Sequence, residues 1–151
     1  MSEPWAPGGP SAHVDHFAAD NLPPPSAWPE IVFSRLPDLA ALDNRINCAT
    51  ELLDRKAAEH PDRRAVFDND LSWSYGDLLA EANRIAHVLV DDLGVRPGNR
   101  VLLRSANNPM YAACWFAVMK VGAVAVATMP LLRARELTYM ADFAQVRVAL
   151  C

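Results

Sequence analysis

The stretch RVLLRSANNPMYAACWFAVMKVGAVAVATMPLLRARELTYMADFAQVRVALC, residues 100–151, decides the fold. It opens with Val101–Leu103, an apolar run without alternation that is typical of a strand covered on both faces. The pattern continues with a helix that has no charged residue, a second buried strand, a helix and a third strand, over 110–119, 123–128, 136–143 and 146–150. Strands and helices that alternate with short connections predict a parallel sheet with right-handed crossovers.

The helix over 110–119 has recognisable ends, because Asn107 or Asn108 can cap it, Pro109 fits its first turn and Gly122 can end it. A membrane span is the alternative, since 109–132 is long enough to cross a bilayer and contains Lys120 as its one charged residue. That charge lies near the middle, where it costs roughly 3 kcal/mol to insert. The sequence therefore favours a helix followed by a strand, and no membrane.

Upstream of the deciding stretch, the pattern predicts a helix, a hairpin and a second helix. Asn47 caps a helix that runs to Glu59, and two β-prone runs around an Asx-rich turn, 65–67 and 71–74, indicate a hairpin. Ser74 with Asp77 resembles a capping box. The helix that follows has an apolar stripe at a period of about 3.6 residues, formed by Leu78, Leu79, Ala82, Ile85, Ala86, Leu89 and Val90.

Residues 1–45 form a separate unit, a proline-rich arm with eight of the twelve prolines. Proline lacks an N–H donor and disfavours helix before it, so we expect irregular structure, with the first ten or so residues disordered. Apolar residues argue for an arm that lies extended across a domain surface: Phe17, Leu22, Trp28, Ile31, Phe33 and Leu36. A proline-rich docking ligand is the less favoured alternative, because no PxxP repeat with basic flanks occurs.

Composition is that of an ordinary globular protein, with 52% hydrophobic and 21% charged residues. A net charge of −4 gives no reason to expect nucleic acid as a partner. Three cysteines without a CxxC spacing suggest neither a disulfide framework nor a zinc site. Reduced thiols and the absence of a secretory signal at the N-terminus predict a cytoplasmic protein.

Residue chemistry alone identifies no catalytic or metal site. The six glycines are scattered, so no loop can cradle phosphate, and no GxSxG or HExxH motif occurs. His13 and His16 with Asp15 could be imagined as metal ligands, but they lie in the arm without a third partner. Single residues elsewhere have simple explanations: His87 as solvated, and Cys114, Trp73 and Trp115 as packing residues.

Two arginines are the candidate ligand contacts. Arg133 and Arg135 follow Pro130 at the C-terminal end of a predicted strand, where open α/β sheets place ligands. A solvated start of a helix is the alternative for both.

Several segments resemble the acyl-adenylate-forming superfamily, which includes acyl-CoA synthetases, luciferases and peptide-synthetase adenylation domains. They match its first two core motifs, the turn between them and a helix start: WSYGDL at 73–78, MKVGAVAVATMP at 119–130, GVRPGNRV at 94–101 and NNP at 107–109. Three segments are most similar to aryl-CoA ligases of the 2-aminobenzoate and benzoate type: 17–29, 45–48 and 127–137.

The resemblance implies that residues 46–151 are the N-terminal portion of an adenylate-forming domain, a Rossmann-like or flavodoxin-like α/β subdomain that is cut off at its C-terminal end. It implies an enzyme of aromatic acid degradation that uses ATP, Mg²⁺ and coenzyme A to convert an aryl carboxylate into a thioester by way of an acyl-adenylate. In the superfamily, the phosphate loop, the magnesium ligands, the acyl pocket and the catalytic lysine all follow the part matched here.

The resemblance therefore transfers no catalytic residue to this chain, and it predicts that the 151-residue piece is inactive by itself. Some aryl-CoA ligases place a basic residue just after the matching proline to contact a phosphate of coenzyme A. That position is Leu131 here, so Arg133 and Arg135 remain the possible contacts. An unfinished sheet also predicts self-association through an exposed edge. A free-standing flavodoxin-like binding module is the alternative from another class.

Overall fold

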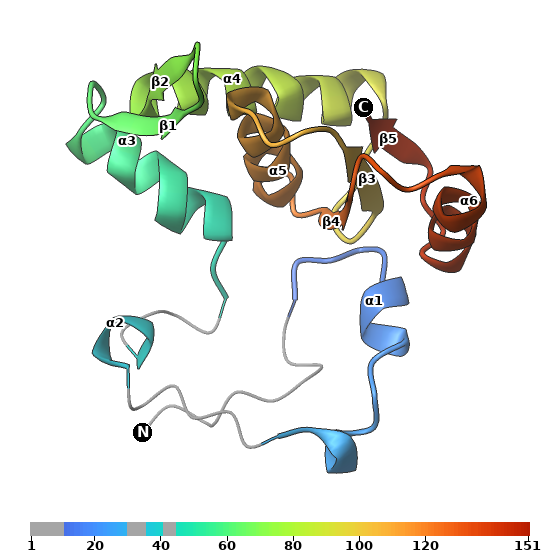
Figure 1. Ribbon diagram of the computed structural model, residues 1–151. Coiled ribbons are helices and arrows are strands. Elements are labelled where there is room, and N and C mark those ends of the chain that lie inside the picture. The colour runs from blue at the N-terminus through green and yellow to red at the C-terminus, as the bar shows by residue number, and fades with distance from the viewer. Residues whose placement is uncertain (1–10, 30–35, 41–44) are drawn as a thin grey trace.

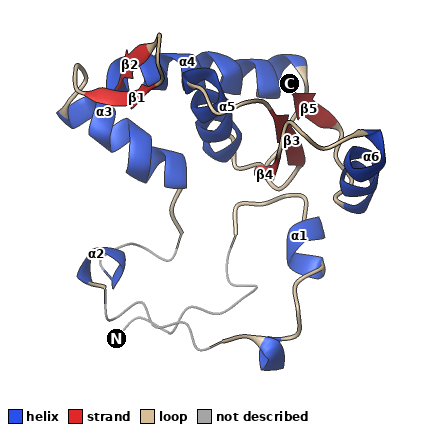
Figure 2. Ribbon diagram, viewed as in Figure 1, coloured by secondary structure: helices blue, strands red, loops and turns tan. Residues whose placement is uncertain are grey.

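The computed structural model describes residues 11–29, 36–40 and 45–151 (Figures 1 and 2). The disorder expected for the first ten residues, and the apolar contacts expected of Ile31 and Phe33, lie outside the described residues.

A three-stranded parallel sheet lies at the centre of the fold, as the sequence predicts. Its strands are β3 (Arg100–Arg104), β4 (Val124–Thr128) and β5 (Val148–Leu150), in the order β4-β3-β5. Arg100 lies opposite Val124, and Val101 lies opposite Val148. β3 is therefore the central strand, and its apolar run is buried on both faces, as expected of a strand without alternation.

The two crossover helices lie on opposite sides of this sheet (Figure 1). α5 (Pro109–Lys120) joins β3 to β4, and α6 (Ala134–Phe143) joins β4 to β5 on the other side of β3. One crossover moves across the sheet from β3 to β4, and the other moves back past β3 to β5. Because both are right-handed and they move in opposite directions, their helices must lie on opposite faces of the sheet. The arrangement is thus of the doubly wound α/β type, as in the Rossmann-like or flavodoxin-like subdomain that the resemblance implies.

α5 and β4 are less buried than the sequence predicts. Met110 is 44% exposed, and Cys114, Trp115 and Phe116 are half-buried, so the uncharged helix is covered mainly on the side that faces α4 and the sheet. β4 is an edge strand of the described sheet, and most of its residues are half-buried. No helix of the described part of the chain has the length and apolar character needed to cross a bilayer.

α4 (Tyr75–His87) begins with the predicted capping box. Ser74 Oγ accepts a hydrogen bond from the Asp77 N–H at 3.1 Å, and the Asp77 carboxylate accepts one from the Ser74 N–H at 2.9 Å. The bond from the Ser74 N–H and a second bond from the Ser74 hydroxyl lower the pKa of the Asp77 carboxyl. The predicted apolar stripe is buried or half-buried except at Val90, which is 46% exposed. Val90 lies in the π-helical turn η4 (Val88–Asp92), where the angular step per residue departs from that of an α-helix.

Two hydrophobic clusters hold the domain together. The larger one joins the end of α4, one face of β3 and the middle of α5: Ala86, Leu89, Val95, Val101, Leu103, Ala117, Val118 and Ala123. The smaller one joins α4 and α5 to the helix that Asn47 caps: Leu53, Leu78, Ala82 and Ala113. Trp115 packs against the first cluster and Trp73 against the second, which agrees with their predicted packing role.

The predicted hairpin and first helix are both present. β1 (Arg64–Phe67) pairs antiparallel with β2 (Ser72–Ser74), and the helix before them consists of a π-helical turn, η3 (Thr50–Asp54), followed by α3 (Arg55–Glu59). Asn47 caps this helix through the N–H groups of Ala49 and Thr50. Its side-chain amide also donates to the Met119 and Lys120 carbonyls at the end of α5, so one residue joins both helices.

The described part of the arm contains only short helices. These are α1 (Phe17–Asp20), the 3₁₀ turn η1 (Pro25–Ala27) and α2 (Pro37–Ala40). The N–H groups of Val14 and Asp15 both donate to the Pro97 carbonyl at 3.1 Å. Residues 14 and 15 therefore dock onto the turn before β3, while Leu22 and Leu36 are exposed.

Candidate functional site

The C-terminal edge of the parallel sheet is the candidate site, because open α/β sheets bind ligands where the chain turns to opposite sides of a strand. In the order β4-β3-β5, that point lies between the ends of β3 and β5. The residues beside it are Arg104, the loop 105–108 that leads into α5, and Leu150 with Cys151. Asn108 caps α5 by accepting a hydrogen bond from the Tyr111 N–H at 2.8 Å.

Arg104 ends the central strand at this edge. Its Nη2 donates to the Pro130 carbonyl at 2.7 Å and to the Leu132 carbonyl at 3.3 Å, which ties the β4–α6 loop to β3. Beside it, the buried Thr128 hydroxyl donates to the Leu103 carbonyl at 3.0 Å. The sequence analysis did not single out Arg104, although a charged residue at the end of the apolar run Val101–Leu103 is a recognisable signal.

Arg133 and Arg135, the predicted ligand contacts, lie beyond the same edge at the start of α6. Both are exposed, and no carboxylate among the described residues pairs with either of them. The Arg133 N–H donates to the Glu136 carboxylate at 3.1 Å, which fixes the first turn of α6. They follow the outer strand β4, so they lie beside the point between the ends of β3 and β5 and not at that point itself. A contact with a phosphate of coenzyme A stays a prediction.

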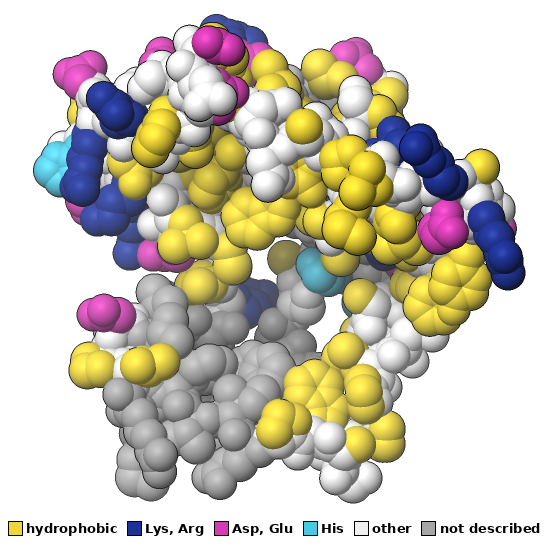
Figure 3. Space-filling view, viewed as in Figure 1, with side chains coloured by type: hydrophobic (Ala, Val, Ile, Leu, Met, Phe, Trp, Pro, Cys, Tyr) yellow, Lys and Arg dark blue, Asp and Glu magenta, His cyan; other side chains and the backbone are white. Residues whose placement is uncertain are grey.

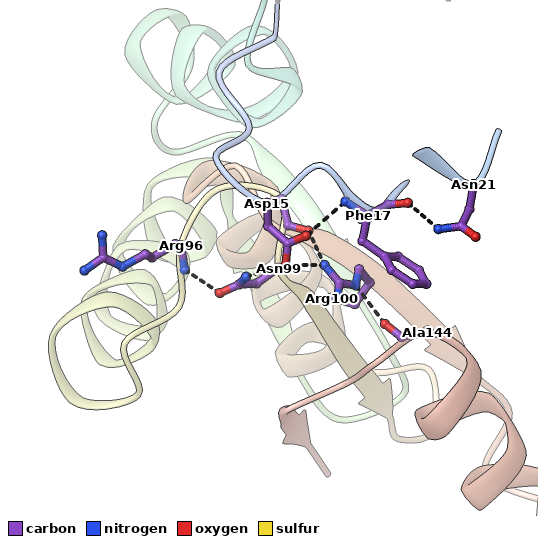
Figure 4. Close-up of polar contacts among 8 residues, drawn as sticks. Asp15, Phe17, Asn21, Arg96, Asn99, Arg100 and Ala144 are labelled. Atoms are coloured by element: carbon purple, nitrogen blue, oxygen red, sulfur yellow. Dashed lines mark hydrogen bonds and ion pairs between the residues drawn. The ribbon is translucent and has the colours of Figure 1, made fainter. Parts of the chain in front are cut away.

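A second polar cluster lies at the opposite, N-terminal edge of the sheet, where the arm meets β3 (Figure 4). Arg100 is buried, and its Nη1 lies 2.5 Å from Asp15 Oδ2 and 2.9 Å from the Gly98 carbonyl, while its Nε donates to the Ala144 carbonyl at 2.7 Å. The Phe17 ring lies 4.4 Å from the guanidinium carbon. Arg100 thus joins the arm, the turn before β3 and the end of α6.

Asp15 is held as a carboxylate by this cluster. The Phe17 N–H and the Arg100 guanidinium both bond to it, and they lower its pKa to about 2. The Asn99 amide donates to the same carboxylate at 2.9 Å. Asp15 is therefore an ion-pair partner of Arg100. Across residues 11–29, 36–40 and 45–151, no three His, Cys, Asp or Glu side chains form a group that could bind a metal ion.

The other reactive side chains have packing or solvent roles. Burial raises the pKa of the Cys114 thiol, so it is a poor nucleophile at neutral pH. His87 is exposed on α4, and its Nδ1 lies 3.2 Å from the Asp91 carboxylate. Both observations agree with the sequence analysis.

These donors do not make a magnesium site. Mg²⁺ prefers carboxylate and phosphate oxygens in an octahedral arrangement, and the described candidate edge presents guanidinium, amide and hydroxyl groups. The arrangement can therefore provide positive charge and a rigid loop, and we derive no step through a metal from it.

Comparison with known proteins identifies related chains. The sequence profile described as "AMP-binding enzyme" matches residues 53–151. Surfactin synthase subunit 1 of Bacillus subtilis (strain 168) is 39% identical over 80 residues, which cover 53% of this chain and 2% of the relative. The salicyl-AMP ligase / salicyl-S-ArCP synthetase of Mycobacterium tuberculosis (strain ATCC 25618 / H37Rv) is 38% identical over 95 residues, which cover 60% of this chain and 17% of the relative.

Among solved structures, the anthranilate CoA ligase AuaEII in complex with anthranoyl-AMP superposes with a TM-score of 0.68 at 28% identity. The superposition covers 73% of this chain and 21% of that one. The chain thus spans about a fifth, or less, of the length of these three proteins.

Proposed function

The chain belongs to the AMP-binding enzyme family, since that family's profile matches residues 53–151, and from this we propose that it forms the N-terminal part of a longer ATP-dependent aryl-CoA ligase. Family members are ligases that form adenylates. The proposal adds that the acid is aromatic, of the 2-aminobenzoate or benzoate type, and that coenzyme A accepts the acyl group.

One observation carries the aromatic assignment: the likeness in fold and sequence to an anthranilate CoA ligase, at a TM-score of 0.68. The salicyl-AMP ligase also acts on an aromatic acid, according to its name. The segments 45–48 and 127–137, which resemble aryl-CoA ligases, lie within the described residues and include the loop that Arg104 holds. The family membership also favours a ligase over a free-standing flavodoxin-like binding module.

The proposed reaction has two steps. A carboxylate oxygen of the aryl acid attacks the α-phosphorus of ATP, the bond between the α-phosphorus and the bridging oxygen breaks, and pyrophosphate leaves. The coenzyme A sulfur then attacks the acyl carbon of the adenylate, AMP leaves, and the thiol proton passes to solvent. Activation is needed because a free carboxylate has no good leaving group. Catalysis in such a reaction is mainly charge stabilisation and orientation.

In this proposal the present chain supplies scaffold and not catalytic groups. The sheet and its two crossovers fix the C-terminal edge, and Arg133 and Arg135 stand beyond it as the predicted contacts with a phosphate of coenzyme A. The residues that bind ATP and Mg²⁺ belong to the remainder of the longer protein.

An adenylation domain that passes the acyl group to a carrier protein is the second candidate. The name salicyl-S-ArCP synthetase favours it, as does the 39% identity to a surfactin synthase subunit. The first step is the same in both candidates, and only the thiol that accepts the acyl group differs.

ATP–pyrophosphate exchange with the full-length protein tests the proposal. We expect exchange with 2-aminobenzoate, benzoate or salicylate, no exchange with fatty acids or aliphatic amino acids, and an aryl-CoA product when coenzyme A is added. Exchange confined to fatty acids or aliphatic amino acids would contradict the aromatic assignment. An adenylate that forms but never reacts with coenzyme A would favour the carrier-protein alternative. The 151-residue chain, assayed in parallel, should support no exchange.

A further inference from the structure

Among the lysine and arginine side chains of the described residues, Arg104 differs from the others because it is half-buried and has no carboxylate partner. Most of the lysines and arginines are exposed, but Arg100, Lys120 and Arg104 are not. Arg100 pairs with the Asp15 carboxylate at 2.5 Å, and Lys120 pairs with the Asp54 carboxylate at 2.6 Å. Arg104 has no carboxylate partner in the described part of the chain. A half-buried cation without a counter-charge costs free energy, so its retention needs a reason.

The hydrogen bonds of Arg104 point to that reason. Its Nη2 binds two carbonyl oxygens, those of Pro130 and Leu132, and both belong to the loop between β4 and α6. A planar guanidinium can hold two oxygens in a fixed geometry, whereas a lysine ammonium acts as a point charge on a flexible stem. The Arg104 Nε is buried and is unpaired within the described residues. The Nη2 group is therefore committed to the loop.

The loop held in this way leads directly to the candidate ligand contacts. Leu132, whose carbonyl accepts from Arg104, precedes Arg133, and the Arg133 N–H is fixed in turn by Glu136. The loop follows Thr128, whose hydroxyl bonds to β3, so both ends of the segment are anchored at the C-terminal edge of the sheet. Arg104 lies at the end of the central strand, which is paired on both sides.

We propose that Arg104 is a positioning residue for the acyl acceptor: it holds residues 130–132 so that Arg133 and Arg135 face the phosphates of coenzyme A. This inference rests on the proposed function. It assigns Arg104 no part in the adenylation step, because its bonds reach only the loop. The unneutralised guanidinium also adds positive charge at the edge where a phosphate would approach.

The test compares Arg104→Gln, Arg104→Lys and the double variant Arg133→Gln/Arg135→Gln in the full-length protein, with Arg96→Gln as the control. Arg96 is an exposed arginine in the turn at the opposite end of β3. We expect Arg104→Gln to raise KM for coenzyme A about tenfold or more, the scale of one charge-assisted hydrogen bond, and to leave ATP–pyrophosphate exchange unchanged. Arg104→Lys should keep the charge but lose the fixed in-plane directions of the two Nη2 N–H bonds, and it should restore only part of the affinity.

The remaining results are also decisive. The double variant should raise KM for coenzyme A as Arg104→Gln does, and the control should match the wild type. The proposal is overturned if KM for coenzyme A is unchanged in Arg104→Gln or in the double variant. It is also overturned if Arg104→Lys restores the wild-type KM in full, or if Arg104→Gln loses both ATP–pyrophosphate exchange and thioester formation. If the wild-type protein shows no exchange with any aryl acid, then the proposed function fails, and that outcome is distinct from all of these.

Discussion

Replacing Asp15 by asparagine should destabilise the domain by about 2–3 kcal/mol, although residue 15 lies in the arm and outside the region that matches the family. The Asp15 side chain is 28% exposed and its partner Arg100 only 6%. Lowering the Asp15 pKa from 3.8 to about 2 corresponds to about 2 kcal/mol at neutral pH, and partial exposure reduces this through solvent screening. Leaving Arg100 buried without a counter-charge adds to the loss.

The pH dependence has a definite sign. The folded-state pKa of Asp15 is lowered, so its contribution is present above the unfolded value of 3.8 and is lost as the pH falls from there towards 2. Asp15→Asn should therefore differ from the wild type at pH 7, and the difference should shrink as the pH approaches 2.

Urea denaturation followed by tryptophan fluorescence measures this loss, with Asp20→Asn as the matched control. Asp20 is an exposed carboxylate in α1 of the same arm. We expect the control to lie within about 0.5 kcal/mol of the wild type, as surface substitutions usually do. If Asp15→Asn also falls within that range at pH 7, then the arm is not fastened to β3 by this pair, and the reasoning is wrong.

Three further predictions concern single positions. Gly98→Ala should lower the free energy of unfolding by more than about 2 kcal/mol in the same urea assay, because φ is +90° and a Cβ would lie 2.1 Å from a backbone oxygen of the arm. Gly94→Ala is the control, since φ is +63° but the space around a Cβ is open, and it should cost about 1 kcal/mol. Asn47→Ala removes a cap and two bonds to α5, so we expect a loss of about 1–3 kcal/mol by thermal or urea unfolding, and a neutral result would refute its joining role. The 151-residue chain should self-associate in sedimentation velocity, and Ala127→Lys on edge strand β4 should reduce that; a monomer would contradict the exposed-edge prediction.

Apolar side chains are exposed around α6. Tyr139 and Phe143 are exposed and stack with their ring centroids 5.9 Å apart, and hydrophobic side chains are visible over α6 (Figure 3). A helix that buries none of its apolar residues is unusual in a finished domain. Sedimentation velocity measures whether this surface mediates self-association.

Features encoded by neighbouring residues could be predicted from the sequence. The capping box at Ser74, the cap at Asn108 and the hairpin depend on residues a few positions apart, and all three are present. The parallel sheet followed from the alternation of strands and helices, because the handedness of crossovers leaves few topologies.

Features that depend on distant residues could not be predicted. The Asp15–Arg100 pair joins positions far apart in the chain, and no local pattern encodes it. The burial of Val90 and Met110 was overestimated, because periodicity identifies an apolar side chain and not the neighbour that covers it. Arg104 has a recognisable signal in its place at the end of an apolar run, but its partners could not be predicted, because they are carbonyl groups of a loop that follows a different strand.

Mass spectrometry of the full-length protein incubated with ATP, Mg²⁺ and 2-aminobenzoate or benzoate, without coenzyme A, shows whether the protein is an aryl-acid ligase, as we propose. We expect an aryl-adenylate of the expected mass, which disappears when coenzyme A is added and is replaced by the aryl thioester. Failure to form any aryl-adenylate, with adenylates formed from fatty acids or aliphatic amino acids under the same conditions, would contradict it.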